Sequence, residues 1–119
     1  MTRMPVVADQ FYPGDPARLR AAMDLLVPEV AGAKKPALAV VLPHAGYIYS
    51  GATAGRTVSE VEVPETVVLL GPNHHGRGAA LAMGTEDWRM PMGTVPVDRQ
   101  LAAAILERST IIVADEVAH

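Results

Sequence analysis

VLPHAGYIYSG, residues 41–51, places a histidine directly after an apolar run that ends at Pro43. The pattern recurs in VVLLGPNHHGRG, residues 67–78, where two histidines follow an apolar run and Gly-Pro. The runs at 37–42 and 66–70 are continuously apolar rather than alternating, which is typical of strands covered on both faces. Both stretches therefore predict a buried strand followed by a histidine-bearing loop.

Helix signals separate these expected strands. Asp15-Pro16 pairs an N-cap residue with a proline at the first helical position and predicts a helix that ends near Val27, before Pro28. A second, small-residue helix is expected over residues 52–60, opened by Ser50 or Gly51, and Asp98 caps a third. We expect shorter strands at 79–83 and 110–114, and an irregular loop over 84–97.

Alternating strands and helices predict an α/β fold with a central sheet flanked by helices, in a single domain over residues 1–119. Ligands of open α/β sheets bind at the carboxyl ends of the strands. His44, His74 and His75 follow the two apolar strands, so they are expected at this edge.

Composition narrows the classes of partner. The net charge is −3 without a basic block, which disfavours nucleic acid and anionic membranes as partners. No cysteine is present, and the N-terminal residues lack the apolar region of a signal peptide. The longest apolar runs are too short to span a bilayer. A cytoplasmic protein is the default expectation.

The histidines suggest a metal site, because imidazole is a common ligand for iron, copper and zinc. Adjacent residues of extended backbone point to opposite sides, so only one of His74 and His75 is expected to ligate. The alternative is that these are loop histidines without chemistry.

Other polar groups have functional and structural interpretations. Tyr47 and Tyr49 either bind substrate or pack a loop, and Trp88 either lines a pocket or anchors its loop. The candidate carboxylate ligands, which are otherwise solvated loop charges, are Asp87, Asp115 and Glu116.

The chain resembles the Memo family, whose bacterial and archaeal members are called AmmeMemoRadiSam system protein B. The resemblance rests on QFYPGDP (10–16), LPHAGYIYSG (42–51), LLGPNHHGRG (69–78), Trp88 with MPMGTVPVD (90–98), and DEVAH (115–119). It implies a fold like that of class III extradiol dioxygenases, with the site in a deep vestibule. His44 and His74 match two metal-binding positions of the family.

The resemblance also implies iron or copper rather than zinc, and redox chemistry on a small molecule. His75 and Tyr47 would then be catalytic or substrate-contacting groups. The family's prokaryotic name implies a radical-SAM protein and an AMMECR-type protein as partners.

Three departures from the family pattern matter. The family is roughly twice this length, so the 119 residues are expected to represent its N-terminal half, with further metal ligands in the other half. Asp9 stands where a glycine is usual, and Met90 replaces a usual threonine. Apolar strands without their usual cover predict poor solubility or a homo-oligomer.

Two other functions stay open from the sequence. The first is a non-enzymatic protein that binds a peptide or protein partner on the same scaffold. The second is a metal-dependent hydrolase, in which zinc-bound water attacks an amide or ester.

Overall fold

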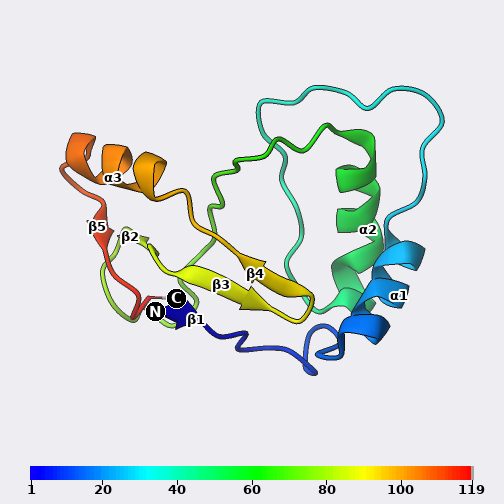
Figure 1. The fold of residues 1–119 in the computed structure, drawn as a ribbon, viewed down its shortest axis with the longest axis horizontal. Helices are drawn as coiled ribbons and strands as arrows, with labels where there is room; N and C mark the ends of the chain where they lie inside the picture. Colours follow the sequence, from blue (N-terminus) through cyan, green and yellow to red (C-terminus); the bar gives the residue numbers. More distant parts are fainter. Residues whose placement is uncertain (119) are drawn as a thin grey trace. The chain divides into compact units, whose positions relative to one another are not determined.

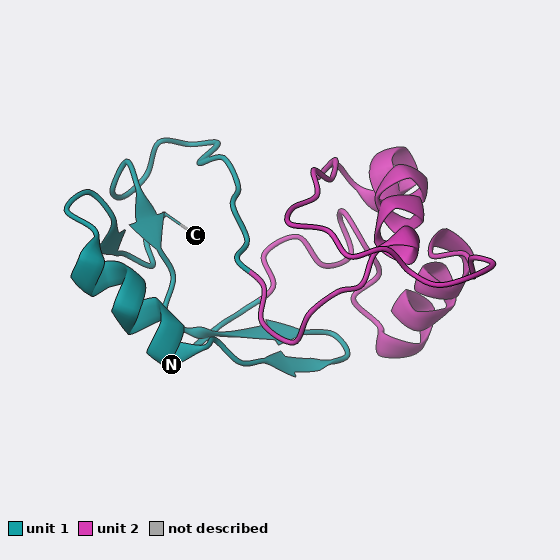
Figure 2. Ribbon diagram, turned by 90° about the horizontal axis from the view of Figure 1, so that it is seen from above, with its two compact units in different colours: residues 1–4, 68–119 teal, residues 5–67 magenta. Residues whose placement is uncertain are grey.

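The computed structural model describes residues 1–118, which contain three helices and five short strands (Figure 1). The chain divides into two compact units (Figure 2). Unit 1 comprises residues 1–4 and 68–119, and unit 2 comprises residues 5–67. The mixed α/β class is confirmed. The expected single domain over 1–119 stays a prediction.

Unit 2 is built on two helices, α1 (Pro16–Leu26) and α2 (Tyr47–Glu60), which pack against each other (Figure 1). Asp15 caps α1 as expected, because its carboxylate accepts a hydrogen bond from the Arg18 N–H at 2.9 Å. Glycines bring the helices close: a Cβ at Gly55 would meet the backbone of Leu26. The small residues of α2 thus allow its close approach to α1.

Helix α2 begins at Tyr47, five residues before the predicted start, with Gly46 as its N-cap residue. Ser50 does not cap it. The Ser50 hydroxyl donates to the Ala45 carbonyl at 2.9 Å from inside the helix. The predicted start was wrong because the backbone of residues 10–12 supplies a partner for the first turn. The Tyr47 N–H donates to the Phe11 carbonyl at 2.8 Å.

Unit 1 holds two small sheets rather than one central sheet. In the first, β3 (Asp87–Met90) pairs with β1 (Thr2–Arg3) in parallel and with β4 (Gly93–Val95) in antiparallel. In the second, β2 (Ala82–Met83) lies parallel to β5 (Val113–Ala114). The short strands expected at 79–83 and 110–114 are therefore confirmed, but each is only two residues long.

Residues 84–97 were expected to form an irregular loop, and that prediction was wrong. Residues 87–95 of this range form the β3–β4 hairpin, in which Trp88 lies opposite Val95 and Gly93 adopts a φ of 142° after the turn. Trp88 also stacks under the Arg3 guanidinium at 4.0 Å, which ties β1 to the hairpin. Helix α3 (Arg99–Arg108) follows with Asp98 as its cap, as predicted.

The two apolar strands predicted at 37–42 and 66–70 are not formed, and these residues are exposed. A strand is stable only where a neighbouring backbone satisfies its N–H and C=O groups. Within its own unit, neither segment has a hydrogen-bonded neighbouring strand among the described residues. Apolar sequence alone therefore did not decide strand formation.

Candidate functional site

His44 lies in unit 2, in the loop that leads into α2, and is exposed. It precedes the N-cap residue Gly46 by two positions. The bond from the Tyr47 N–H to the Phe11 carbonyl ties this loop end to the segment QFYP. Two stretches of the family resemblance, QFYPGDP and LPHAGYIYSG, are therefore hydrogen-bonded to each other. The loop that carries His44 is fixed at its C-terminal end by this bond.

Asp9, which directly precedes the QFYP segment, has a left-handed backbone conformation with a φ of 63°. This region of backbone space favours glycine, and Asn and Asp tolerate it best among other residues. Its side chain compensates, because the carboxylate accepts the Gly14 N–H at 2.7 Å. The Asp9 N–H donates to the Tyr12 carbonyl, also at 2.7 Å. The departure from the family's glycine thus has a physical explanation.

Tyr47 is half-buried at the start of α2. Its hydroxyl donates to the Met23 sulfur at 3.7 Å, and its ring lies 5.7 Å from the Tyr12 ring. Burial, and secondarily the Tyr12 phenolate, raise the pKa of Tyr47 above 10.0. A raised pKa works against a phenolate ligand or base at neutral pH. The catalytic role proposed for Tyr47 stays a prediction.

The raised pKa of Tyr47 predicts a loss of stability in alkali. The folded state holds this proton more tightly than the unfolded state, so the contribution is complete below pH 10 and is lost as pH rises through the folded pKa. We expect the wild type to lose more unfolding free energy above pH 10 than Tyr47→Phe does. Urea titrations of both proteins below and above this pH would measure the difference. Equal losses would contradict the prediction.

His74 and His75 lie in unit 1, in an exposed turn. Asn73 organises this turn on both sides: its amide donates to the Arg77 carbonyl at 2.6 Å, and its oxygen accepts the His75 N–H at 3.2 Å. Gly76 follows with a φ of 62°. The backbone here is turned rather than extended, so the premise that adjacent histidines must face opposite sides was wrong.

His44 belongs to unit 2 and His74 to unit 1, and their convergence on one ion stays a prediction. Within residues 1–118, no group of three or more His, Cys, Asp or Glu side chains is placed to hold a metal ion. The imidazoles suit a late first-row metal, and the described residues supply fewer donors than a complete metal site requires.

The three candidate carboxylates have structural partners in unit 1. Asp87 accepts the Val97 N–H at 3.0 Å and the Arg99 guanidinium at 2.9 Å. Asp115 accepts the Ala79 N–H at 2.7 Å. Neither carboxylate is the freely solvated loop charge that the sequence suggested.

Glu116 is the third of these carboxylates, and one of its oxygens accepts three hydrogen bonds. The donors are the backbone N–H of Thr85 and Glu86 and the Thr85 hydroxyl. Asp115 and Glu116 therefore hold two loops of unit 1, the one before β2 and the one between β2 and β3. Sequence reasoning missed this role, although the DEVAH stretch had already been recognised as a family feature.

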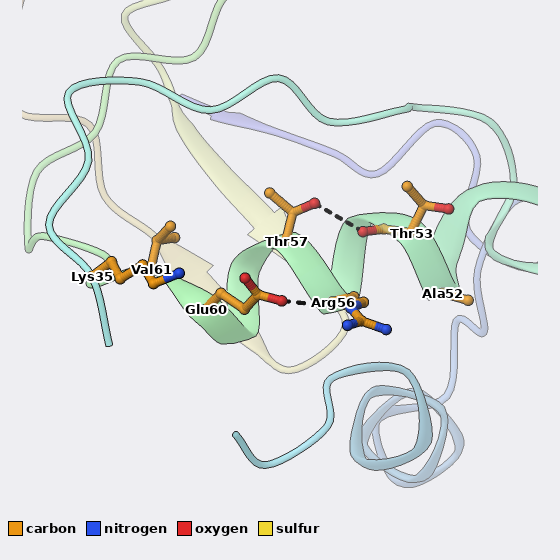
Figure 3. Close-up of a pocket in the computed structure, with 7 residues that line it drawn as sticks. All are labelled: Lys35, Ala52, Thr53, Arg56, Thr57, Glu60 and Val61. Atoms are coloured by element: carbon orange, nitrogen blue, oxygen red, sulfur yellow. Dashed lines mark hydrogen bonds and ion pairs between the residues drawn. The ribbon is translucent and has the colours of Figure 1, made fainter. Parts of the chain in front are cut away.

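A hollow of about 500 Å³ lies along α2 in unit 2 (Figure 3). Its lining includes Lys35 and two threonines, Thr53 and Thr57. The ion pair between Arg56 and Glu60, at 3.5 Å, also lines it. Both partners of that pair are well exposed, so the hollow is open and carries charges of both signs. None of the predicted site residues lines it.

Fold and site together define a mixed α/β protein whose loops present histidines after apolar segments. The sequence matches the family described as Memo-like protein over residues 3–119, and the chain belongs to this family. The predicted membership is confirmed. None of the helices in residues 1–118 is long and apolar enough to cross a membrane.

Curated relatives carry the same family name. A MEMO1 family protein of Methanopyrus kandleri is 40% identical over 132 aligned residues, which cover 100% of this chain and 47% of the relative. A MEMO1 family protein of Aquifex aeolicus is 45% identical over 106 residues, covering 88% of this chain and 40% of the relative. The chain thus spans less than half the length of these relatives.

Proposed function

We propose that His44 and His74 each donate an imidazole to one mononuclear metal site of a Memo-family protein. The observation that carries the proposal is the position of His44. It is exposed, in a family stretch, and its loop is tied at the start of α2 by the Tyr47–Phe11 bond. An anchored loop holds a ligand at a lower entropic cost than a free loop does. The Asn73 turn supplies comparable order beside His74.

The proposed scaffold resembles class III extradiol dioxygenases, with the metal in a vestibule open to a small molecule or peptide. Iron or copper is favoured over zinc by the family resemblance. His75 would contact substrate from the same turn as His74, and Tyr47 would act as a positioning residue from the first turn of α2. A radical-SAM protein and an AMMECR-type protein are proposed as partners on the same basis.

Metal content tests the ligand assignment. If the assignment holds, anaerobically purified wild-type protein should retain iron or copper, measured by mass spectrometry, although two imidazoles alone would hold the metal weakly. His44→Ala and His74→Ala should each lose most of it, because a site with few protein ligands cannot spare one. His75→Ala is the matched control, because it removes an imidazole from the same turn as His74. This variant should retain the metal.

Other outcomes separate the alternatives. Stoichiometric zinc that depends on His44 and His74 would indicate the hydrolase, in which metal-bound water attacks an amide or ester. Metal content that is indifferent to both substitutions would contradict the ligand assignment. A partner-binding protein without metal chemistry is the remaining candidate, and the exposed apolar segments of the chain favour it.

A further inference from the structure

Ser50 is a buried polar residue in the first turn of α2, with 7% of its surface exposed. It lies six positions after His44, in the same family stretch. Buried hydroxyl groups are almost always hydrogen-bonded, so the partner of the hydroxyl indicates what the side chain holds in place.

The partner of Ser50 lies outside its own helix. Its hydroxyl donates to the Ala45 carbonyl at 2.9 Å, and the Gly46 carbonyl is farther away, at 3.4 Å. A hydroxyl has one proton, so the shorter contact is the stronger hydrogen bond. Serine hydroxyls inside helices usually bond a carbonyl three or four residues earlier. Here the acceptor is five residues earlier, in the loop before α2, so the side chain ties the helix to that loop.

This bond reaches one residue farther than the backbone bonds of the helix. The Gly46 carbonyl accepts the N–H of Tyr49 at 2.9 Å and the N–H of Ser50 at 3.1 Å. The side chain of Ser50 extends this anchoring to Ala45, which directly follows His44.

A second segment fixes the same loop end. The Tyr47 N–H donates to the Phe11 carbonyl, and a Cβ at Gly46 would lie 3.5 Å from that carbonyl oxygen. These contacts hold residues two and three positions after His44, whereas the Ser50 bond holds the adjacent residue. Of these contacts, the Ser50 bond is the closest to His44 in the sequence.

We propose that Ser50 is a positioning residue for His44, and this inference rests on the metal-ligand role proposed above for His44. The hydroxyl fixes the Ala45 carbonyl and thereby limits rotation of the backbone that carries the imidazole. Hydrogen-bond partners behind a metal ligand hold it in its binding orientation, and their loss weakens metal affinity by roughly tenfold or more. A ligand on a loop needs this support more than a ligand on a helix or strand does.

Ser50→Ala tests the inference by removing the hydroxyl. Without metal, we expect the amides of Tyr47 and Tyr49 to exchange hydrogen roughly fivefold faster, because one hydrogen bond that holds this loop end is lost. The affinity for Cu(II), measured by competition with glycine, should fall roughly tenfold. Ser50→Thr keeps a hydroxyl at this position and should match the wild type in both measurements.

Ser59→Ala is the matched control in the same helix. Ser59 is also buried, with 1% of its surface exposed, and its hydroxyl donates to the Arg56 carbonyl at 2.7 Å, in the last turns of α2. Its loss should lower the free energy of unfolding about as much as Ser50→Ala does. It should leave the exchange of the Tyr47 amide and the affinity for Cu(II) unchanged, because Ser59 does not hold the loop of His44.

The inference fails if Ser50→Ala leaves the exchange at Tyr47 and Tyr49 unchanged, if Ser59→Ala speeds it equally, or if Ser50→Thr behaves like the alanine variant. It also fails if Cu(II) bound through His44 is held as tightly by Ser50→Ala as by the wild type. Cu(II) binding that does not depend on His44 would overturn the ligand assignment instead. The exchange rates would then still decide whether Ser50 holds the loop.

Discussion

Gly55→Ala is expected to lower the free energy of unfolding of unit 2 by about 2 kcal/mol. A Cβ at this position would overlap the Leu26 carbonyl oxygen and lie 2.6 Å from the carbonyl carbon. Backbone cannot rotate away as a side chain does, so α1 and α2 must separate. Overpacking of this kind costs up to about 3 kcal/mol, and alanine recovers about 1 kcal/mol through its higher helix propensity. Urea unfolding followed by far-UV circular dichroism would measure the net loss.

Gly51→Ala is the matched control in the same helix. Its Cβ would lie 2.9 Å from a terminal methyl of Leu26, which is the flexible end of a side chain. We expect a change of less than about 1 kcal/mol, because the methyl can move and helix propensity improves. Equal losses in the two variants would show that backbone overlap at Gly55 is not the cause.

Glu116→Ala is expected to destabilise unit 1 by about 2 kcal/mol. The substitution removes the single acceptor of three hydrogen bonds and leaves the N–H groups of Thr85 and Glu86 without it. Donors bonded to a charged acceptor contribute about 1.5–3 kcal/mol each, and solvent reaching the half-buried loop offsets part of the loss. Trp88, the single tryptophan of the chain, lies in β3 directly after this loop and reports its unfolding by fluorescence.

Glu116→Gln separates the acceptor from the charge. The glutamine amide keeps an oxygen at the same place, so at least half of the lost stability should return. A glutamine variant as unstable as the alanine variant would contradict the hydrogen-bonding account and assign the effect to the negative charge. The result bears on the family, because DEVAH is one of the stretches that carry the resemblance.

Candidate ligands differed in how far the sequence could place them. The pattern of histidine after an apolar run correctly located His44 and His74 in loops, since Pro43 and Pro72 end the preceding runs. It could not show whether they meet, because convergence depends on chain segments far apart in the sequence. The carboxylates were harder still. Whether Asp115 binds a metal or the Ala79 N–H depends on which loop lies beside it.

The sequence by itself determined the features that depend on neighbouring residues. Helices α1 and α3 begin where predicted because Asp15 and Asp98 accept N–H groups three residues ahead, a local interaction. Family membership belongs here too, since ordered motifs carry it.

Tertiary structure decided the rest. Helix α2 begins earlier than predicted because the Tyr47 N–H donates a hydrogen bond to the Phe11 carbonyl, 36 positions away in the sequence. Trp88 lies in a hairpin because it pairs with Val95 and contacts Arg3. The 37–42 segment also shows that secondary structure depends on tertiary contacts, because here the predicted strand is not formed. Its residues favour a strand, but a strand requires a second backbone to satisfy its polar groups, and that requirement is met only by contact with another segment.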